Sequence, residues 1–306
     1  MGGARRVHPR VRPGRHVIVA APTPFQASGA IDFQALRSNV ERWIAAGVDG
    51  VLVLGSTGEA IHLEERESEE IVAAAREAVP SDRLLVVGTG RPTTAAAIRW
   101  TNRAAELGAD LALVLTPHYY RHEMTSEALE RHFRAVADAA RAPVLLYSMP
   151  DLTGVSIPAD LVGALSRHPR IRGLKDSSGD VAGLFDRIAR SEEGFWVLNG
   201  SGRAVYPALA SGASGSVLAI ASVAPELAVE AHRAFESGDD ERARRAATTL
   251  ARLSSLLAPY GLGGLKAAMT VRGYRGGICR QPLTFDFKSM RHVEAALAET
   301  GLSERD

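Results

Sequence analysis

Short apolar segments alternate with longer segments of helical periodicity along most of the chain. Short apolar runs bounded by turn residues predict buried strands, and apolar residues spaced three or four apart predict amphipathic helices. We expect strands at Val17–Ala21, Gly50–Leu54, Leu84–Gly88, Asp110–Leu115, Val144–Tyr147, Ile171–Lys175, Phe195–Leu198 and Ser214–Leu218. We expect helices at Phe33–Ala46, Glu64–Val79, Thr93–Leu107, Ser126–Ala140, Pro158–Ser166, Val181–Ser191, Arg203–Ala210 and Pro225–Phe235.

Eight strands that are each followed by a helix predict an α/β fold, a (β/α)8 TIM barrel over residues 17–238. The alternative is an open doubly wound sheet, whose first turn is usually glycine-rich, whereas the first turn here reads Ala21-Pro22-Thr23-Pro24-Phe25. Beyond Gly238 the alternation stops, so we interpret residues 239–306 as a C-terminal helical domain. Its expected helices are Asp239–Ala258, Gly261–Arg272 and Lys288–Glu299.

The overall composition narrows the class of partner. The 306 residues are 46% hydrophobic with a formal net charge of +1, which is typical of a globular protein that binds small molecules, with no general attraction to nucleic acid or membrane. A single cysteine, Cys279, excludes an intrachain disulfide framework and favours a cytoplasmic location. Residues 1–16 are rich in arginine and lack an apolar stretch, so we expect a basic N-terminal tail, which could bind an anionic partner, rather than a secretory signal.

The predicted strand at Ile171–Lys175 ends on one of only three lysines among 36 basic residues. Arginine stays protonated at any working pH, whereas a lysine in a low-dielectric pocket loses its proton readily and can attack a ketone to form a Schiff base. Alternatively, the lysine reaches solvent or pairs with a carboxylate. Because side chains alternate along a strand, Lys175 and Ser177 should share one face, with Asp176 on the other.

Two further strand ends carry candidate chemistry, since active sites on this fold lie at the carboxyl ends of the strands. The second strand runs into Gly55-Ser56-Thr57-Gly58-Glu59, where hydroxyls and free backbone N–H groups could hold a carboxylate, or where Ser56 or Thr57 could simply cap the next helix. The fifth strand ends in Tyr147, whose phenol could lie at the site or be a core tyrosine with a bonded hydroxyl.

Three loops give weaker signals. The run Gly200-Ser201-Gly202-Arg203 could cradle a phosphate, or form a tight turn that lets a substrate approach the backbone. Tyr119 and Tyr120 could serve packing or an interface, or deliver a phenol into a site. His118 and His122 have the i, i+4 spacing of metal ligands but no third ligand nearby, so we expect no metal site.

Four motifs occur in an order that resembles one family, the pyruvate-dependent class I aldolases and lyases that include dihydrodipicolinate synthase and N-acetylneuraminate lyase. The motifs are Gly55-Ser56-Thr57-Gly58-Glu59-Ala60, Thr116-Pro117-His118-Tyr119-Tyr120, Tyr147-Ser148-Met149-Pro150-Asp151-Leu152-Thr153-Gly154 and Gly173-Leu174-Lys175-Asp176-Ser177-Ser178-Gly179-Asp180. The resemblance extends from about Val17 to Pro282, which is nearly the whole chain.

The resemblance implies a role for particular residues. Lys175 would form the Schiff base, Tyr147 would move protons, and Tyr119 would match a tyrosine that a neighbouring subunit adds to the proton relay. Thr57 would belong both to the catalytic group and, with Ser56 and Gly58, to the site for the pyruvate carboxylate. The remaining substrate contacts would come from Ser177, Leu152 and Gly200. The family's usual homotetramer, a dimer of dimers, is expected, and the reaction needs no cofactor or metal.

The motif details separate members of this family. Dihydrodipicolinate synthases carry an arginine where this chain has Leu152, and N-acetylneuraminate lyases carry a leucine there. The motifs of this chain most resemble those of the 4-hydroxy-2-oxoglutarate aldolases, and this includes the late segment from Gly264-Leu265-Lys266 to Cys279-Arg280. We therefore favour cleavage of a 4-hydroxy-2-oxo acid to pyruvate and an aldehyde.

Several alternatives stay open. Within the family they are a 4-hydroxy-tetrahydrodipicolinate synthase, an aldolase like N-acetylneuraminate lyase, and a 2-keto-3-deoxy sugar acid aldolase or dehydratase. Outside it are a non-catalytic pyruvate-binding regulator and a barrel enzyme for phosphorylated sugars. A regulator would form the adduct with pyruvate without releasing an aldehyde. An enzyme for phosphorylated sugars would be inhibited by phosphate and would not be affected by borohydride.

Overall fold

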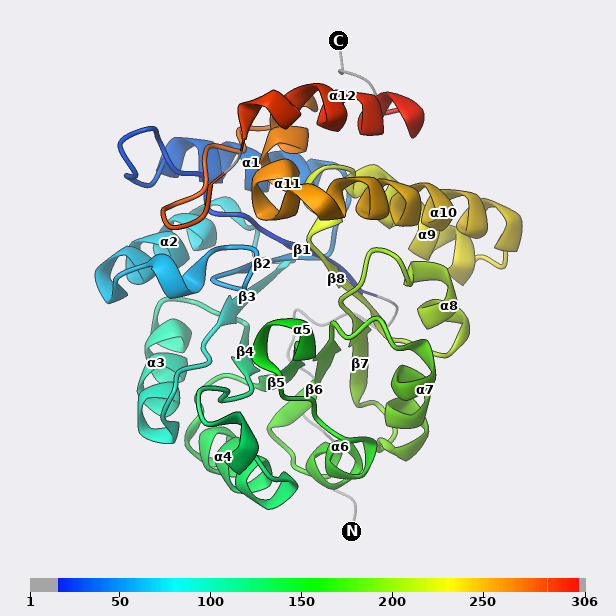
Figure 1. The fold of residues 1–306 in the computed structure, drawn as a ribbon. Helices are drawn as coiled ribbons and strands as arrows, with labels where there is room; N and C mark the ends of the chain where they lie inside the picture. Colours follow the sequence, from blue (N-terminus) through cyan, green and yellow to red (C-terminus); the bar gives the residue numbers. More distant parts are fainter. Residues whose placement is uncertain (1–15, 285, 303–306) are drawn as a thin grey trace.

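The computed structural model describes residues 16–284 and 286–302, and these form the predicted (β/α)8 barrel (Figure 1). Eight parallel strands pair in chain order, and β8 pairs with β1 to close the ring. The strands are β1 (His16–Ala20), β2 (Gly50–Val53), β3 (Leu84–Gly88), β4 (Leu111–Leu115), β5 (Val144–Ser148), β6 (Ile171–Asp176), β7 (Trp196–Asn199) and β8 (Gly215–Leu218). The open-sheet alternative is therefore excluded.

A helix follows each strand, as the periodicity predicts. The helices are α1 (Phe33–Ala45), α2 (Glu65–Ala78), α3 (Thr94–Glu106), α4 (Ser126–Ala139), α6 (Ala159–Ser166), α7 (Val181–Arg190), α8 (Val205–Ala210) and α9 (Pro225–Glu236). Several begin at side-chain caps: Asp32, Thr93 and Thr125 each accept a hydrogen bond from a backbone N–H of the first turn. One further short helix, α5 (Pro150–Thr153), was not predicted, and in Figure 1 it lies over the middle of the strand ring.

Alternate residues of each strand face opposite sides, which gives the barrel an inner and an outer core. The inner core is a single cluster of side chains: Ile18, Ala20, Leu52, Leu84, Val86, Leu111, Leu113, Leu145, Tyr147, Trp196, Leu198 and Val217. The outward residues pack against the helices instead. Gly173 points inward, where a side chain would collide with Trp196 of β7, so the inner core requires glycine there. Polar groups that need a cavity are thereby confined to the ends of the barrel.

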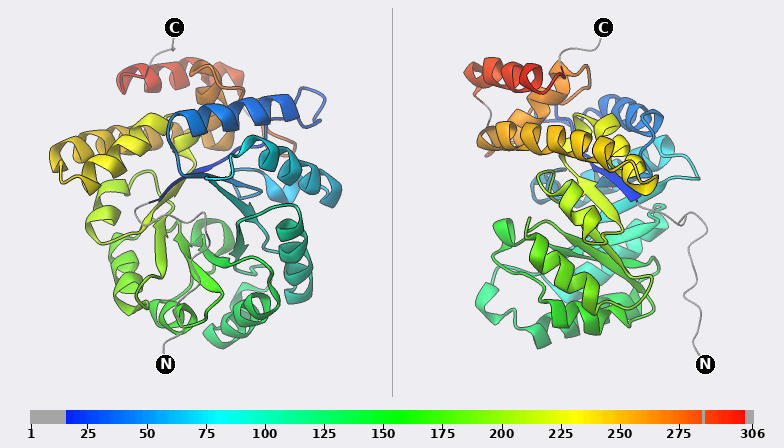
Figure 2. Two further views of the ribbon diagram at one scale, coloured as in Figure 1. Left: turned by 180° about the vertical axis from the view of Figure 1, so that it is seen from behind. Right: turned by 90° about the vertical axis from the view of Figure 1, so that its right-hand side faces the viewer.

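The C-terminal helices occur as predicted, at α10 (Asp240–Leu257), α11 (Gly261–Val271) and α12 (Met290–Glu299). They gather beside α1 and α9 at one side of the molecule (Figures 1 and 2). Leu250 of α10 and Met269 of α11 are fully buried in the same hydrophobic cluster as Val19 and Trp43 of the barrel. The C-terminal helices therefore share a hydrophobic core with the barrel.

The first strand begins at His16, one residue earlier than predicted, and the His16 ring packs against Trp196 with 4.3 Å between centroids. The rest of the predicted basic tail lies outside the described residues. No helix in the described part of the chain is both long and apolar enough to span a bilayer.

Candidate active site

Lys175 lies near the carboxyl end of β6 and faces the barrel interior, with only 4% of the residue exposed. Its register partner on β5 is Tyr147, and Lys175 Nζ lies 4.3 Å from the centre of the Tyr147 ring. The next residue, Asp176, points the other way and pairs with Arg187 Nη1 of α7 at 3.4 Å. The predicted alternation is therefore confirmed, and the neighbouring carboxylate is not the partner of the lysine.

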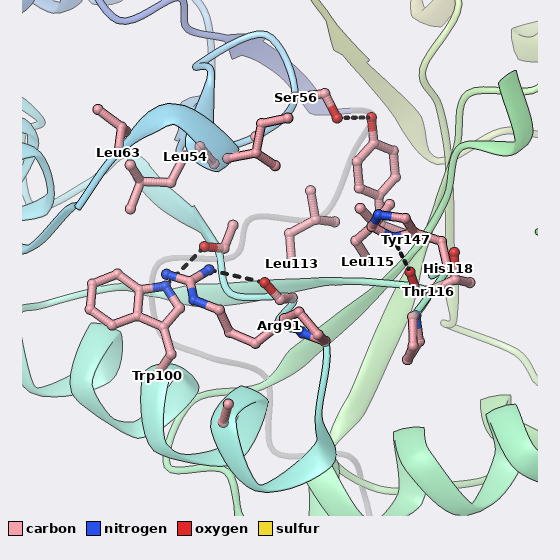
Figure 3. A pocket seen from close by; sticks show the side chains of 18 of the residues that line it. Leu54, Ser56, Leu63, Arg91, Trp100, Leu113, Leu115, Thr116, His118 and Tyr147 are labelled. Atoms are coloured by element: carbon pink, nitrogen blue, oxygen red, sulfur yellow. Dashed lines mark hydrogen bonds between the residues drawn. The ribbon is translucent and has the colours of Figure 1, made fainter. Parts of the chain in front are cut away.

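Tyr147 is also buried, and its hydroxyl lies 3.5 Å from Ser56 Oγ, as Figure 3 shows. Burial alone would raise the pKa of this phenol. The positive charge of Lys175 and the hydroxyls of Ser56 and Ser177 outweigh burial, so the pKa of Tyr147 lies below its ordinary value. A phenol of lowered pKa next to an amine is suited to accepting and returning protons.

The loop Gly55–Glu59 brings two hydroxyls to the same place. Ser56 and Thr57 are half-buried, and their backbone N–H groups donate no hydrogen bond within residues 16–284 and 286–302. Neither residue caps a helix, because α2 is instead capped by Glu64 and Glu67 through a reciprocal capping box. Two free N–H groups with two hydroxyls provide what a carboxylate needs.

Strained backbone flanks this loop on both sides. Leu54 (φ 57°) and Glu59 (φ 56°) are the non-glycine residues with left-handed backbone in the described part of the chain. Gly88 of β3 makes room for the backbone of Leu54, because a side chain at residue 88 would collide with the Leu54 carbonyl oxygen. Such a conformation persists only where the surroundings hold it.

A buried ion pair holds the second strained residue. Lys266 of α11 donates to Glu59 Oε1 at 2.5 Å, to the Thr23 carbonyl at 2.8 Å and to the Ile278 carbonyl at 2.6 Å. Glu59 Oε2 in turn accepts a hydrogen bond from the backbone N–H of Arg280 at 2.9 Å. The Gly55–Glu59 loop is therefore tied to the C-terminal helices through residues that are far apart in sequence.

Sequence reasoning did not identify Glu59 and Lys266 as part of the site. The same signal that singled out Lys175 was available, because Lys266 is also one of three lysines in the chain. Burial lowers the pKa of Lys266, although the hydrogen bond and charge of Glu59 act to raise it. The amine nevertheless uses all three donors on protein oxygens, so it is not free to attack a substrate.

A cavity of about 430 Å³ opens above the lysine. Its lining includes most of the predicted site residues: Lys175, Tyr147, Ser56, Thr57, Ser177, Leu152 and Gly200. Gly58 does not line it, and its carbonyl accepts a hydrogen bond from Thr23 Oγ1 at 2.6 Å. Tyr119 is 84% exposed, lies outside the cavity and packs edge-on against Tyr120. The C-terminal helices add unpredicted walls through Ser254, Leu262 and Leu265.

A second cavity of about 530 Å³ lies next to the first and shares Ser56 and Tyr147 with it (Figure 3). Its floor includes Arg91, whose guanidinium stacks on Trp100 at 4.8 Å from the ring centre. Within the described residues, no group of three histidine, cysteine or acidic side chains is arranged to hold a metal ion.

The fold and the candidate site together define a (β/α)8 barrel protein with a buried lysine and tyrosine side by side near the carboxyl ends of β5 and β6. The chain belongs to the dihydrodipicolinate synthetase family, whose model matches residues 14–300. This confirms the family to which the sequence motifs pointed.

Individual relatives agree with this assignment. The chain is 37% identical over 268 residues to a 4-hydroxy-tetrahydrodipicolinate synthase of an Exiguobacterium species, covering 87% of this chain and 91% of the relative. The structure of YagE, a prophage protein of this family from E. coli K12 in complex with pyruvate, matches with a TM-score of 0.89 at 27% identity over 95% of this chain and 100% of that one. A monomeric dihydrodipicolinate synthase variant matches with a TM-score of 0.89 at 26% identity over 94% and 97% of the two chains.

These names describe synthases and a family member bound to pyruvate. The finer resemblance to the 4-hydroxy-2-oxoglutarate aldolases stays a prediction.

Proposed function

We propose that this protein is a class I lyase that forms a Schiff base between Lys175 and the ketone of a 2-oxo acid, with pyruvate as one product. The observation that carries the proposal is the adjacency of Lys175 and Tyr147, with Nζ 4.3 Å from the ring centre. The free N–H groups of Ser56 and Thr57 support it, because they offer the carboxylate of a 2-oxo acid a place beside the lysine.

The first stage is imine formation. The unprotonated Lys175 amine attacks C2 of the bound 2-oxo acid, the resulting carbinolamine loses water, and a protonated imine forms. The hydroxyls and N–H groups of Ser56 and Thr57 hold the carboxylate, so that C2 faces the amine. The Tyr147 phenol carries protons to and from the carbinolamine oxygen.

The second stage breaks a carbon–carbon bond. A base removes the proton from the 4-hydroxyl, the C3–C4 electron pair moves toward the protonated imine, and an aldehyde leaves while an enamine remains on Lys175. Tyr147 suits the role of that base, since its pKa is lowered by Lys175 and by the hydroxyls of Ser56 and Ser177. The enamine then takes a proton at C3, and water releases pyruvate and the free amine.

Cleavage of a 4-hydroxy-2-oxo acid is the reaction that we favour. Leu152 lines the cavity and is 64% exposed, at the point where synthases of this family are expected to carry an arginine. A leucine side chain offers neither charge nor a forked donor to the carboxylate of a second substrate.

The synthase reaction is the second candidate, because relatives such as the Exiguobacterium protein carry that name. The two reactions are separated by assaying pyruvate release from 2-oxo acids with and without a 4-hydroxyl, next to condensation of pyruvate with an amino-aldehyde. Release that depends on the 4-hydroxyl supports the aldolase. Condensation without such release supports the synthase.

Assembly bears on the proton relay. Tyr119 lies outside its own chain's cavity, so it could act only in the site of a neighbouring copy. We propose a homotetramer in which Tyr119 completes the partner's site, and the existence of a monomeric synthase variant makes this a point to measure. Analytical ultracentrifugation of the wild type and of the Y119F variant, paired with activity, tests it. A fully active monomer contradicts the proposal.

The decisive experiment is reduction with borohydride in the presence of pyruvate. We expect one adduct, on Lys175, identified by mass spectrometry of peptides. An adduct on Lys266 or Lys288 instead, or none, contradicts the proposed function.

A further inference from the structure

A buried ion pair lies directly behind the strand that carries Lys175. Asp176, the last residue of β6, pairs through Oδ2 with Nη1 of Arg187 on α7 at 3.4 Å, and both residues are buried. The described residues that line the 430 Å³ and 530 Å³ cavities do not include either one, so neither can touch a substrate bound there. A buried ion pair is often no more stabilising than apolar residues of the same volume, so stability alone does not account for it.

Asp176 fixes the starts of two loops that line the 430 Å³ cavity. Its Oδ1 accepts a hydrogen bond from the Ser178 N–H at 2.9 Å, and its carbonyl accepts one from the Gly200 N–H at 2.7 Å. Between these groups, Ser177 donates its backbone N–H to the Ser148 carbonyl at 2.9 Å. The backbone at Ser177 and Gly200, both of which line the cavity, is therefore held in place by hydrogen bonds.

Arg187 reaches a third loop. Its Nε donates to the Ile157 carbonyl at 3.1 Å, at the end of the segment that carries α5 and its cavity residue Leu152. Gly183, one turn earlier in α7, leaves room for the arginine, because a methyl group at residue 183 would lie 2.6 Å from Arg187 Nη1 and displace it. The guanidinium thus joins the loops after β5 and β6, and Asp176 joins the loop after β7 to them.

The loops need this support more than the strands do. Lys175 and Tyr147 lie on neighbouring strands, where the hydrogen-bond ladder pairs them directly. Ser177 lies just beyond the end of β6, yet its hydroxyl helps to lower the pKa of Tyr147. A loop that shifted would therefore change the proton transfer at Tyr147 before it changed the position of the amine.

We propose that Arg187 and Asp176 are positioning residues for the reaction, which hold the three loops on the β5–β7 side of the cavity in one arrangement and keep Ser177 in the cavity wall with Tyr147. The inference rests on the proposed function, because it concerns the proton transfers assigned to Tyr147. A guanidinium suits this role, since its rigid fork of donors can hold a carboxylate and a carbonyl group at once. Neither residue takes part in making or breaking a bond.

Pyruvate alone tests the inference through two measurements. Borohydride trapping gives the concentration of pyruvate at half of the maximal adduct on Lys175, which reports imine formation. Proton NMR in deuterium oxide gives the rate at which the C3 protons of pyruvate exchange for deuterium. In that exchange the imine gives up a C3 proton to form the enamine, and the enamine takes a deuteron in return, so no aldehyde is needed.

In Arg187→Met the exchange rate should fall about 10- to 100-fold while the half-maximal pyruvate concentration stays within about threefold, because a displaced loop disturbs proton transfer more than attack by a lysine held in a strand. Arg187→Lys should restore part of the exchange rate, since an ammonium keeps the charge but not the fork. Arg190→Met, at an arginine of the same helix that pairs with Asp160 on the surface, is the matched control and should exchange at the wild-type rate.

A double variant separates positioning from stability. Arg187→Met alone leaves a buried carboxylate without its partner, whereas Arg187→Met combined with Asp176→Asn leaves no charge stranded and keeps an oxygen to accept from the Ser178 N–H. The urea midpoint should therefore be higher in the double variant than in Arg187→Met, while the exchange of C3 protons should stay slow. If Arg187→Met does not fold, the double variant carries the comparison with the wild type.

Exchange that recovers together with the urea midpoint overturns the positioning role. So does exchange at the wild-type rate in folded Arg187→Met, an equal loss of trapping and exchange, or a wild type that forms the adduct but exchanges no proton. Each of these results leaves the proposed Schiff base intact, because the wild type still forms the pyruvate adduct on Lys175. If the wild type forms no adduct there, the proposed function fails and the positioning role fails with it.

Discussion

Two of the three lysines in this chain are almost completely buried, yet their surroundings differ in one respect. Lys266 gives its three donors to Glu59 and two carbonyl groups. Lys175 faces a cavity and the ring of Tyr147, and the carboxylate beside it in sequence points away. Burial therefore does not make a lysine reactive. The role that we propose for Lys175 rests instead on its place in the wall of the cavity.

The pKa of Lys266 illustrates the same point. Burial lowers the pKa of that amine, and taken alone a lowered pKa is a sign of a functional lysine. Here it marks a lysine that holds Glu59 of the Gly55–Glu59 loop. The following predictions test whether Lys175 forms the covalent adduct while Lys266 has a structural role.

The largest effect should come from Lys175→Met. Loss of the amine removes the covalent step, so turnover should fall by about 10⁴-fold or more and pyruvate should leave no adduct. Lys288→Met, at an exposed lysine of the C-terminal region, is the matched control and should behave as the wild type. Mass spectrometry after borohydride treatment measures the adduct. Trapping that persists in Lys175→Met would remove the distinction between the two lysines.

Tyr147→Phe should have the next largest effect. The phenol moves protons but forms no covalent bond, so the turnover rate should fall about 10²- to 10⁴-fold while the pyruvate adduct still forms. Stopped-flow assays of pyruvate release, compared with adduct yield, separate these two quantities. A variant that turns over at the wild-type rate rules out the role given to Tyr147.

Lys266→Met should lower stability and leave the identity of the adduct unchanged. Removing one partner from a buried ion pair strands the other charge, and the free energy of unfolding should fall by about 3–5 kcal/mol. The double variant Lys266→Met with Glu59→Gln should lose less, since no uncompensated carboxylate is then buried. Urea denaturation monitored by circular dichroism measures both, with Lys175→Met for comparison.

If the double variant is no more stable than Lys266→Met, the ion pair is not what holds the loop. A lower yield of the pyruvate adduct in a folded Lys266→Met protein, with the adduct still on Lys175, is the expected secondary effect, because the Ser56–Thr57 loop depends on the Glu59 backbone.

The smallest effect concerns pH. The proposed base is the ionised phenol, so the turnover rate should rise with pH as Tyr147 loses its proton. That rise should be centred below the ordinary tyrosine value, because Lys175 and the hydroxyls of Ser56 and Ser177 lower the pKa. The slope should be about tenfold per pH unit below the pKa. A pH–rate profile checks this, and the rise should vanish in Tyr147→Phe but persist in Lys266→Met.

Much of the barrel could be predicted because each strand and helix has a local signature. Alternation along β6 was enough to separate Lys175 from Asp176, and the strand ends were enough to bring Tyr147 and Ser56 to one edge. The contact between Glu59 and Lys266 joins residues that are 207 apart in sequence, so no local pattern reveals it. The same holds for Ser254 of α10, which meets Gly202 only after the chain has closed the barrel.

The backbone of Leu54 was equally beyond prediction from local pattern. A leucine rarely adopts φ near 57°, and it does so here because Gly88 of the neighbouring strand leaves room for its carbonyl group. Propensity favours an ordinary strand end at this residue, and a contact between strands overrides it. The residues missed from the sequence are thus the ones that hold the candidate site rather than the ones proposed to react.

Helix α11 presents Leu262 and Leu265 to the substrate cavity and Lys266 to the underside of the Gly55–Glu59 loop. A chimera that joined this barrel to the last seventy residues of a distant relative would replace both at once. Recombination at the end of α9, which looks like a natural crossover point in the sequence, should therefore yield few active hybrids unless the donor brings a matching lysine.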